Sequence, residues 1–337
     1  MSSEFFFIIN PNSHGEKTGK NLKKILRKIK DYIGDFSYEL TKGPRDEVNI
    51  AKKAIEEGYK TIVALGGDGT ATNVGDVIVE HPGVKLGLVS AGSMCDWHRT
   101  HSIPYELDSG LAILTEGYSE KFPAMRCKGE KNYYSFDMAD GGFSGKAAAA
   151  AFYELKWLKI GIIKYNYLAV KYLFKTPNVP ATITIDDNEP IEIKELTNVM
   201  VALGDDIVGF KVLPGNPYFV QKYQDLGIVI AHGMKGLKRL LMLLRASNAK
   251  HVGMKGVWLT RGRKIRVVTH KEPLCWEAEG EIFNETGSEV VIERVENAIE
   301  LIVPKDREYP DYYNEEIYYE KFEDSFRKRK LQVKVKH

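Results

Sequence analysis

Three glycines around one aspartate form the part of this sequence best suited to chemistry. Gly66-Gly67-Asp68-Gly69-Thr70 follows the apolar run Thr61–Leu65 and precedes a helix-like segment. Glycine permits positive φ angles and lets backbone amides converge on an anion, while the N-terminus of a helix adds partial positive charge. The turn therefore predicts a site for the phosphates of a nucleotide.

The aspartate in this turn needs its own explanation, because a carboxylate repels phosphate. A Mg²⁺ ion or a substrate hydroxyl between the two would remove the conflict, so Asp68 is predicted to organise Mg²⁺ or to accept a proton. The alternative is a tight turn in which Asp68 only caps the following helix.

The segments that must hold this turn alternate between strand-like and helix-like character up to about Tyr118. They are Phe5–Ile9, Lys17–Ile33, Phe36–Thr41, Arg45–Glu57, Thr61–Leu65, Thr70–Glu80 and Val84–Val89. This alternation predicts an α/β doubly wound domain with a parallel sheet, in which ligands bind beyond the carboxyl ends of the strands. The Gly-rich turns 10–19, 66–70 and 91–96 lie at those positions.

The pattern changes from about Lys121 to short β-like runs separated by turn signals. These runs are Ala181–Ile185, Ile191–Ile193, Val199–Leu203, Ile228–Ala231, Val257–Thr260, Ile265–Thr269 and Val290–Arg294, and helix-like insertions occur at Ala147–Lys175 and Lys235–Ala246. They predict an antiparallel, β-sandwich-like second domain, with a hairpin turn at Asp186–Pro190.

Composition limits the classes of function. With 337 residues the chain exceeds one hydrophobic core, so two domains with a cleft between them are expected. A net charge of +2 gives no field that would attract nucleic acid, and no apolar run is long enough to span a bilayer. Three widely spaced cysteines suggest neither disulfides nor a paired metal site, which favours a cytoplasmic protein.

The order of the motifs resembles the diacylglycerol kinase catalytic-domain family, which also includes sphingosine and ceramide kinases and bacterial lipid kinases. Its opening loop resembles Asn10-Pro11-Asn12-Ser13-His14-Gly15 followed by Gly19, and its Gly-Gly-Asp-Gly-Thr is intact here. A third loop corresponds to Gly92-Ser93-Met94-Cys95-Asp96-Trp97. Later elements resemble Gly142-Phe143, Asp225-Leu226-Gly227 and Glu279-Gly280-Glu281.

Two residues depart from the family pattern. Met94-Cys95 stands where the family has Gly-Asn, which affects close backbone approach and an amide contact to the nucleotide. Glu279 stands where the family has a catalytic aspartate, and it keeps the carboxylate on a side chain one methylene longer.

The resemblance implies transfer of the γ-phosphoryl group of ATP, with Mg²⁺, to a lipid hydroxyl. It assigns Asp68, Glu279 and Glu281 to catalysis, with Glu279 accepting the hydroxyl proton. Asp68 and Asp225 become candidate Mg²⁺ ligands. The nucleotide would contact Asn10, Pro11, Thr41, Gly66, Gly67, Gly69, Thr70, Gly92, Ser93 and Asp96.

The resemblance also implies a domain organisation. Residues 1–120 would form the nucleotide-binding domain, residues 121–300 the mainly β domain that contributes the lipid cleft, and residues 301–337 would return to the first domain. The expected partners are a lipid substrate and a membrane surface bound peripherally, with no nucleic acid, and a homodimer is left open.

A basic amphipathic segment offers a candidate membrane contact. In Lys235–Arg245 the cations Lys235, Lys238, Arg239 and Arg245 fall on one side at helical period, which suits an anionic membrane. The alternative is a helix packed on the second domain with a solvated basic face.

Two rival functions remain open at this stage. NAD kinases resemble this chain in the glycine turn and the first domain, but lack the Asn-Pro opening and the late Glu-Gly-Glu element. A non-catalytic lipid- or nucleotide-binding relative would also explain Met94, Cys95 and Glu279. The sequence does not say which lipid is the acceptor.

Overall fold

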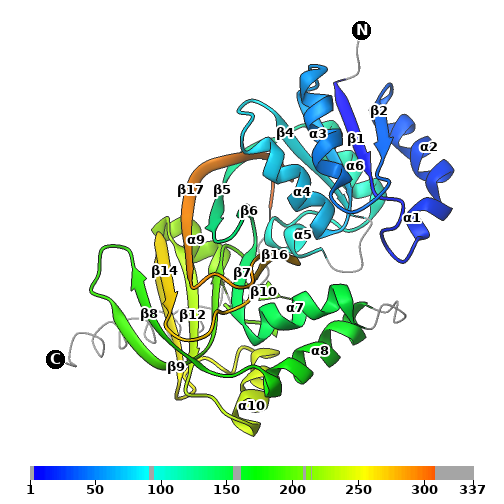
Figure 1. Ribbon diagram of the computed structural model, residues 1–337. Coiled ribbons are helices and arrows are strands. Elements are labelled where there is room, and N and C mark those ends of the chain that lie inside the picture. Colours follow the sequence, from blue (N-terminus) through cyan, green and yellow to red (C-terminus); the bar gives the residue numbers. More distant parts are fainter. Residues whose placement is uncertain (1–3, 91–94, 155–160, 208–209, 214, 308–337) are drawn as a thin grey trace. The chain divides into compact units, whose positions relative to one another are not determined.

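The computed structural model in Figure 1 describes residues 4–90, 95–154, 161–207, 210–213 and 215–307. Within them the chain divides into two compact units. The first runs to Ala124 and resumes at Val295, and the second spans Met125–Arg294. The predicted return of residues 301–337 lies outside the described residues beyond residue 307.

The first unit is built on a parallel sheet in the order β2-β1-β3-β4. Its strands are β1 (Phe5–Ile9), β2 (Ser37–Leu40), β3 (Thr61–Gly66) and β4 (Lys85–Ser90). The long strand β17 (Glu289–Ile302) starts in the second unit and ends in the first, where Glu300 and Leu301 pair in parallel with β4.

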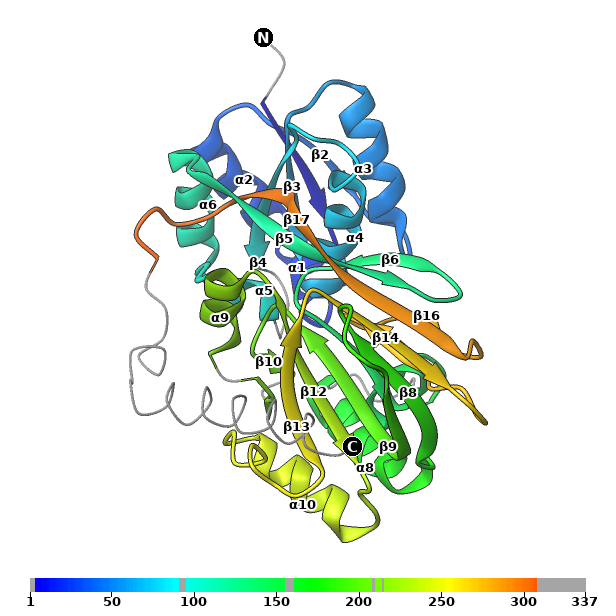
Figure 2. The same ribbon diagram turned by 90° about the vertical axis from the view of Figure 1, so that its left-hand side faces the viewer.

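Helices cover both faces of this sheet, as Figure 2 shows. Helices α2 (Leu22–Ile33) and α6 (Leu107–Glu116) pack together, and so do α3 (Asp46–Glu56) and α4 (Asp68–Ile78). One core lies between the sheet and α2 with α6; its fully buried members include Phe7, Ile9, Ile29, Val63, Leu65, Leu111 and Leu114. Burying each large side chain contributes roughly 1.5–3 kcal/mol. The predicted doubly wound domain is confirmed.

The helix predicted over Lys17–Ile33 is interrupted. Helix α1 (Lys17–Lys20) ends before Asn21, and α2 begins at Leu22. The amide of Gly19 donates a hydrogen bond to Pro11 O at 2.9 Å, and a Cβ on Gly19 would lie 3.0 Å from that oxygen. The opening loop is thus held against α1 by a contact that a larger residue would crowd.

The second unit is built on antiparallel strands. They include β7 (Met138–Gly142), β8 (Val179–Ile185), β9 (Ile191–Ala202), β12 (Leu226–His232), β13 (Val257–Gly262), β14 (Lys264–Thr269), β15 (Trp276–Ala278) and β16 (Glu281–Asn284). The predicted hairpin is confirmed, because Ile183 pairs with Ile191 across the turn. Short strands complete the unit at β6 (Asn132–Ser135), β10 (Asp206–Ile207) and β11 (Phe210–Lys211), and β5 (Ser119–Lys128) leads into it.

One long strand replaces two predicted short ones. Ile191–Ile193 and Val199–Leu203 both belong to β9, whose first half pairs with β8 and whose second half pairs with β7. The polar stretch between the two runs, which suggests a turn, is instead held in the ladder because β12 pairs along β9 as far as Leu196.

In the described part of the second unit, four helices accompany these strands: α7 (Phe143–Tyr153), α8 (Gly161–Lys175), α9 (Asn216–Tyr223) and α10 (Leu237–Ala246). The insertion predicted over Ala147–Lys175 is therefore two helices, α7 and α8, and residues 155–160 lie outside the described residues. Figure 1 shows α8 and α10 next to each other.

Candidate functional site

Three predicted nucleotide-binding segments lie at the carboxyl edge of the parallel sheet. Asn10 follows β1, and its amide donates to Leu65 O at 3.0 Å. Thr41 follows β2, is buried, and donates its amide to Ile9 O at 2.9 Å. Both residues thus extend the strand ladder beyond the strand ends. They lie on neighbouring strands beside Gly66, which ends β3.

Side-chain hydrogen bonds join the opening loop to the glycine turn. Asn10 Nδ2 donates to Thr70 Oγ1 at 3.2 Å, and Thr70 Oγ1 donates in turn to Glu47 Oε1 at 3.4 Å. Asn73 Nδ2 donates to the other oxygen of Glu47 at 3.5 Å. The structure therefore brings Asn10 and Thr70 together as expected, and adds a buried carboxylate that the sequence reasoning missed.

Glu47 carries a sequence signal that would have revealed it. It shares one helical stripe of α3 with Ile50, Ala51 and Ala54, and all four are buried. A carboxylate on the apolar stripe of an amphipathic helix must find polar partners inside the protein. Burial raises the pKa of Glu47, while hydrogen bonds from Asn73 and Thr70 act in the opposite direction.

The glycines of the turn do not have the positive φ angles that were predicted for them. None of Gly66, Gly67 and Gly69 has a positive φ angle, and Gly67 has φ −101°. Gly66 is required for space, because a Cβ there would lie 2.5 Å from Thr70 Oγ1. A Cβ on Gly69 would meet nothing within 4 Å, so this position faces open space. The positive-φ argument is wrong, and close approach to Thr70 replaces it at Gly66.

Asp68 is the first residue of α4 and links two helices. Its Oδ1 accepts a hydrogen bond from the amide of Trp97, at 3.2 Å, in the short helix α5 (Asp96–Thr100). Gly67 occupies the capping position of α4, and no side chain caps that helix. The reading of Asp68 as a helix cap is therefore wrong. Its carboxylate instead fixes the third motif beside the glycine turn.

The third motif is only partly described. Gly92 and Ser93 lie in residues 91–94, outside the described residues. Asp96 begins α5, where its Oδ1 accepts from Arg99 Nη2 at 2.7 Å. Cys95 is buried, and its sulfur lies 3.3 Å from Ser90 Oγ at the end of β4.

Two histidines in this motif act as packing residues. His98 stacks on Tyr105 with ring centroids 5.8 Å apart, and His101 meets the edge of Phe122 at 4.4 Å. Burial lowers the pKa of His98 to about 4 and that of His101 to about 3, so both rings are neutral at physiological pH. Among the described residues no group of three His, Cys, Asp or Glu side chains could hold a metal.

Glu279 and Glu281 flank a tight turn between β15 and β16 in the second unit. Glu279 has φ +51° and Gly280 φ +89°. Glu279 Oε1 accepts three hydrogen bonds, from Ser135 Oγ at 2.8 Å and from the amides of Phe136 and Asp137 at 2.6 and 2.7 Å. This oxygen is saturated by its own unit. Glu281 is half-buried and pairs across the turn with Ala278.

A second carboxyl pair supports this turn from inside and was not predicted. Asp140 on β7 and Glu277 on β15 are buried register partners. Glu277 Oε2 accepts from the amide of Gly280 at 2.6 Å, and the Ser144 hydroxyl donates to Asp140 Oδ1. Burial raises both pKa values, that of Asp140 to about 6, and the charge of Asp140 adds to the effect on Glu277, which favours a proton shared by the two carboxyls.

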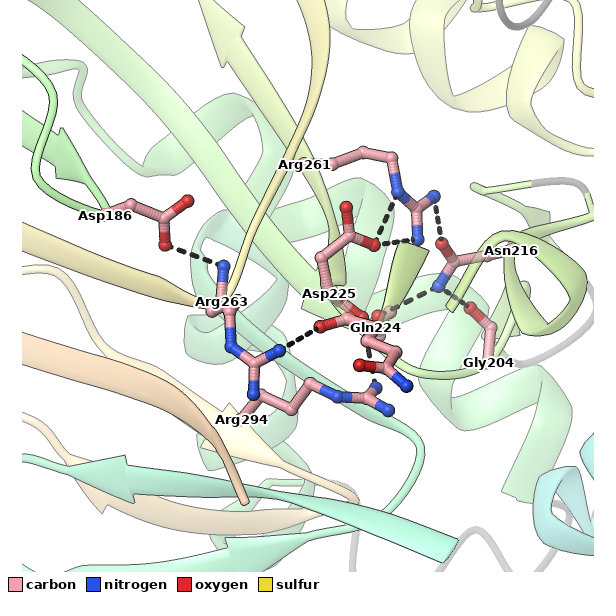
Figure 3. A network of polar contacts seen from close by, with 9 residues as sticks. Asp186, Gly204, Asn216, Gln224, Asp225, Arg261, Arg263 and Arg294 are labelled. Atoms are coloured by element: carbon pink, nitrogen blue, oxygen red, sulfur yellow. Dashed lines mark hydrogen bonds and ion pairs between the residues drawn. The ribbon is translucent and has the colours of Figure 1, made fainter. Parts of the chain in front are cut away.

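Asp225, a predicted Mg²⁺ ligand, belongs to a buried polar clamp shown in Figure 3. Its Oδ1 accepts from Arg261 Nε at 2.7 Å and lies 2.6 Å from Arg261 Nη2. Arg261 Nη1 donates to Asn216 Oδ1 at 3.0 Å, and Arg294 Nη1 donates to the carbonyl of Asp225 at 3.2 Å. A guanidinium on the carboxylate repels a cation, so we assign Asp225 to this clamp and not to Mg²⁺.

The rest of the Asp225-Leu226-Gly227 element fits the same role. Asn216 Nδ2 donates to the carbonyls of Ala202 and Gly204, both at 2.9 Å. A Cβ on Gly227 would lie 2.3 Å from Asn216 Oδ1. Both residues of this motif therefore help to position Asn216. Asp225 holds Arg261, which donates to Asn216, and the missing side chain of Gly227 leaves room for Asn216.

Comparison with known proteins agrees with the motif order. Residues 4–127 match the family model of the diacylglycerol kinase catalytic domain. The predicted family resemblance is confirmed for this part of the chain. A diacylglycerol kinase of Staphylococcus carnosus is 24% identical over 300 residues, which cover 89% of this chain and 94% of that protein.

Solved structures show the same fold. A diacylglycerol kinase from Bacillus anthracis superposes with a TM-score of 0.62 at 16% identity, over 89% of this chain and 97% of that one. Yeast NADH kinase gives a TM-score of 0.50 at 8% identity, over 94% and 88% of the two chains. The fold class is therefore that of diacylglycerol kinases.

Proposed function

We propose that the protein is a lipid kinase that transfers the γ-phosphoryl group of ATP to a lipid hydroxyl. The observation that carries the proposal is the hydrogen-bonded connection of the Asn10 loop to the turn at Gly66–Thr70, in a domain that matches the kinase family. Helix α4 begins at this turn, so the positive end of its dipole is available to phosphate.

Asp68 is the proposed catalytic carboxylate of the first unit. Mg²⁺ is normally held by one or two carboxylates together with substrate phosphates, and when bound with ATP it neutralises charge on the transferred group. A single carboxylate at the glycine turn, such as Asp68, is compatible with that mode. The bond from Trp97 to Asp68 fixes the position of the carboxylate.

Glu281 is the proposed proton acceptor for the lipid hydroxyl. The sequence favoured Glu279, but three donors to Glu279 Oε1 hold this side chain against the backbone of its own unit. Glu281 lies on the same turn, whose geometry is fixed by the hydrogen bond from Gly280 to Glu277. A general base typically contributes roughly a hundredfold to ten-thousandfold in rate.

The test is to incubate the purified protein with γ-labelled ATP, Mg²⁺, a panel of lipid extracts and, separately, NAD. Label in a lipid fraction is expected, and Asp68→Asn serves as the inactive control. Label in NADP would identify an NAD kinase. ATP binding without transfer to any acceptor would identify a non-catalytic relative.

A further inference from the structure

Two neighbouring helices of the second unit expose large apolar side chains. Tyr167, Val170 and Phe174 are exposed on α8, at spacings of three and four residues. Leu237, Leu241 and Leu244 are exposed on α10, at spacings of four and three residues, and Leu237 is 77% exposed. Such spacing places each set on one side of its helix. We call these six residues the α8–α10 face.

The two helices are tied together by Arg239. This arginine is buried, and its Nη1 donates to Leu173 O and Thr176 O at the end of α8, both at 2.6 Å. Its Nε donates to Met234 O at 2.9 Å. Arg239 thus satisfies carbonyls at the C-terminus of α8. The prediction that Arg239 belongs to an exposed basic surface is therefore wrong. The other three cations of that prediction, Lys235, Lys238 and Arg245, are exposed.

The charged residues within α8 and α10 are all basic. Residues 155–185 contain neither Asp nor Glu, and the same holds for residues 226–271. Lys175, Lys238, Arg245 and Lys250 are exposed in these stretches. The acidic residues Glu154 and Glu195 come from outside them and pair with Lys171 and Lys235.

We propose that the α8–α10 face docks on the surface of an anionic lipid bilayer. Exposed leucine and aromatic side chains on helices whose charged residues are all basic suit the boundary between acyl chains and anionic headgroups. A protein partner would more commonly meet both signs of charge at the rim. None of the helices in the described ranges is long and apolar enough to cross a membrane.

This inference rests on the proposed function, because a lipid kinase must reach its acceptor in a membrane. The inference identifies the surface of the protein that would contact the membrane. Neither the glycine turn nor the turn at Glu279–Glu281 contributes a residue to the α8–α10 face, so docking and chemistry can be varied separately.

The experiment is flotation with vesicles of phosphatidylglycerol and phosphatidylcholine, without ATP, using the full chain. Leu237→Ser/Leu241→Ser/Leu244→Ser should weaken vesicle binding by at least roughly tenfold, since each leucine loses apolar area that would be buried. Tyr167→Ser should also weaken vesicle binding. The matched control is Tyr32→Ser, which changes an exposed tyrosine of the first unit and should leave vesicle binding unchanged.

Charge reversal provides the second arm. Lys238→Glu should lower binding to anionic vesicles by about fivefold or more, and added salt should also lower it. The control is Lys52→Glu, a charge reversal at an exposed lysine of α3 in the first unit, which should leave binding unchanged. Circular dichroism confirms that each variant is folded.

The outcomes separate docking from catalysis. Variants that lose vesicle binding but phosphorylate detergent-dispersed acceptor at the wild-type rate support the proposal. If the wild type binds vesicles through this face yet phosphorylates no lipid, the proposed function fails and the docking inference stands. If an active wild type and its Leu→Ser variant bind vesicles equally, or if the variant only loses self-association in light scattering, the docking inference is overturned.

Discussion

At the scale of single residues, two glutamates on one turn have different surroundings. Glu279 holds the backbone of Phe136 and Asp137 and so stabilises its own unit. Glu281 is two residues further along, on β16. The family resemblance assigns the acceptor-side role to Glu279, and the structural role of Glu279 Oε1 is our reason for proposing Glu281 instead.

Glu281→Gln should therefore lower kcat by roughly a hundredfold to ten-thousandfold with ATP affinity unchanged, because a removed general base affects only the chemical step. Glu279→Gln is the matched control, since its amide oxygen can still accept the three hydrogen bonds and activity should stay within about tenfold of wild type. Steady-state kinetics and ATP titration measure both. The reverse ranking of the two variants would return the role to Glu279.

Asp68→Asn tests the first-unit carboxylate. The amide oxygen can still accept the hydrogen bond from Trp97, so the fold should be kept while turnover falls by at least roughly a hundredfold. ATP affinity should fall much less than turnover. Equal losses in binding and turnover, measured by calorimetry and label transfer, would show that Asp68 only positions the loop.

Contacts between residues could be anticipated where a local sequence motif carries the signal. Asn10 and Thr70 were predicted from motifs and lie in contact. Asp140 and Glu277 were missed because they meet only through the pairing of β7 with β15, across more than a hundred residues of sequence. In the sequence, each of the two carboxyls is marked only by being a charged residue among apolar neighbours.

At the scale of elements, two glycines of the turn between β3 and α4 have different surroundings. Gly66 lies close against the side chain of Thr70, whereas Gly69 faces open space. Gly66→Ala should destabilise the protein and weaken ATP binding, because its Cβ would collide with Thr70. Gly69→Ala should leave the fold intact and stabilise α4 by about 0.5–1 kcal/mol, since alanine favours the helix.

Urea unfolding and ATP titration of both variants check this contrast. A Gly69→Ala variant that is stable but binds ATP weakly would indicate that the nucleotide approaches Gly69 directly. Equal destabilisation by the two substitutions would contradict the described geometry of the turn.

The strand pair β7 and β15 gives a prediction about pH. Because the pKa of Asp140 is raised from 3.8 to about 6, the native state binds more protons than the unfolded state in this range, and the stability contribution of the pair is lost as pH rises through it. Asp140→Asn supplies a permanent donor to Glu277 in place of the shared proton. It should reduce that loss by on the order of 2 kcal/mol.

The measurement is the free energy of unfolding in urea at pH 4.5 and 7.5, compared between wild type and Asp140→Asn. His98 and His101 have lowered pKa values and contribute in the opposite direction, with stability rising as pH rises from about 4 to 6.5, but they are present in both proteins and cancel in the difference. Identical pH dependence in the two proteins would contradict a shared proton.

Element boundaries were predictable where hydrophobic period and turn residues coincide. Phe5–Ile9 was predicted exactly as found, and the strand at Thr61–Leu65 needs one more residue. The short strands β15 and β16 were missed because three or four residues carry no period of their own; β15 is held by pairing with β7, and β16 by pairing with β15.

At the scale of the whole molecule, the change from alternating helix and strand to antiparallel strands near Lys121 anticipates the described boundary at Ala124. The crossing of β17 from the second unit to the first was not predicted, since Val290–Arg294 is only its opening part. Its continuation through the polar stretch at Glu296 and Asn297 breaks the apolar pattern on which strand prediction depends.

The central claim is phosphoryl transfer from ATP to a lipid hydroxyl, and product stoichiometry tests it most directly. Purified protein is given ATP, Mg²⁺ and the lipid that takes up label, and ADP and phosphorylated lipid are quantified together by mass spectrometry. We expect equal amounts of the two products from wild type, and at least roughly a hundredfold less of both from a Glu281→Gln protein that still binds ATP. ADP formed without a phosphorylated lipid, or a phosphate ester on a nucleotide in place of the lipid, would contradict it.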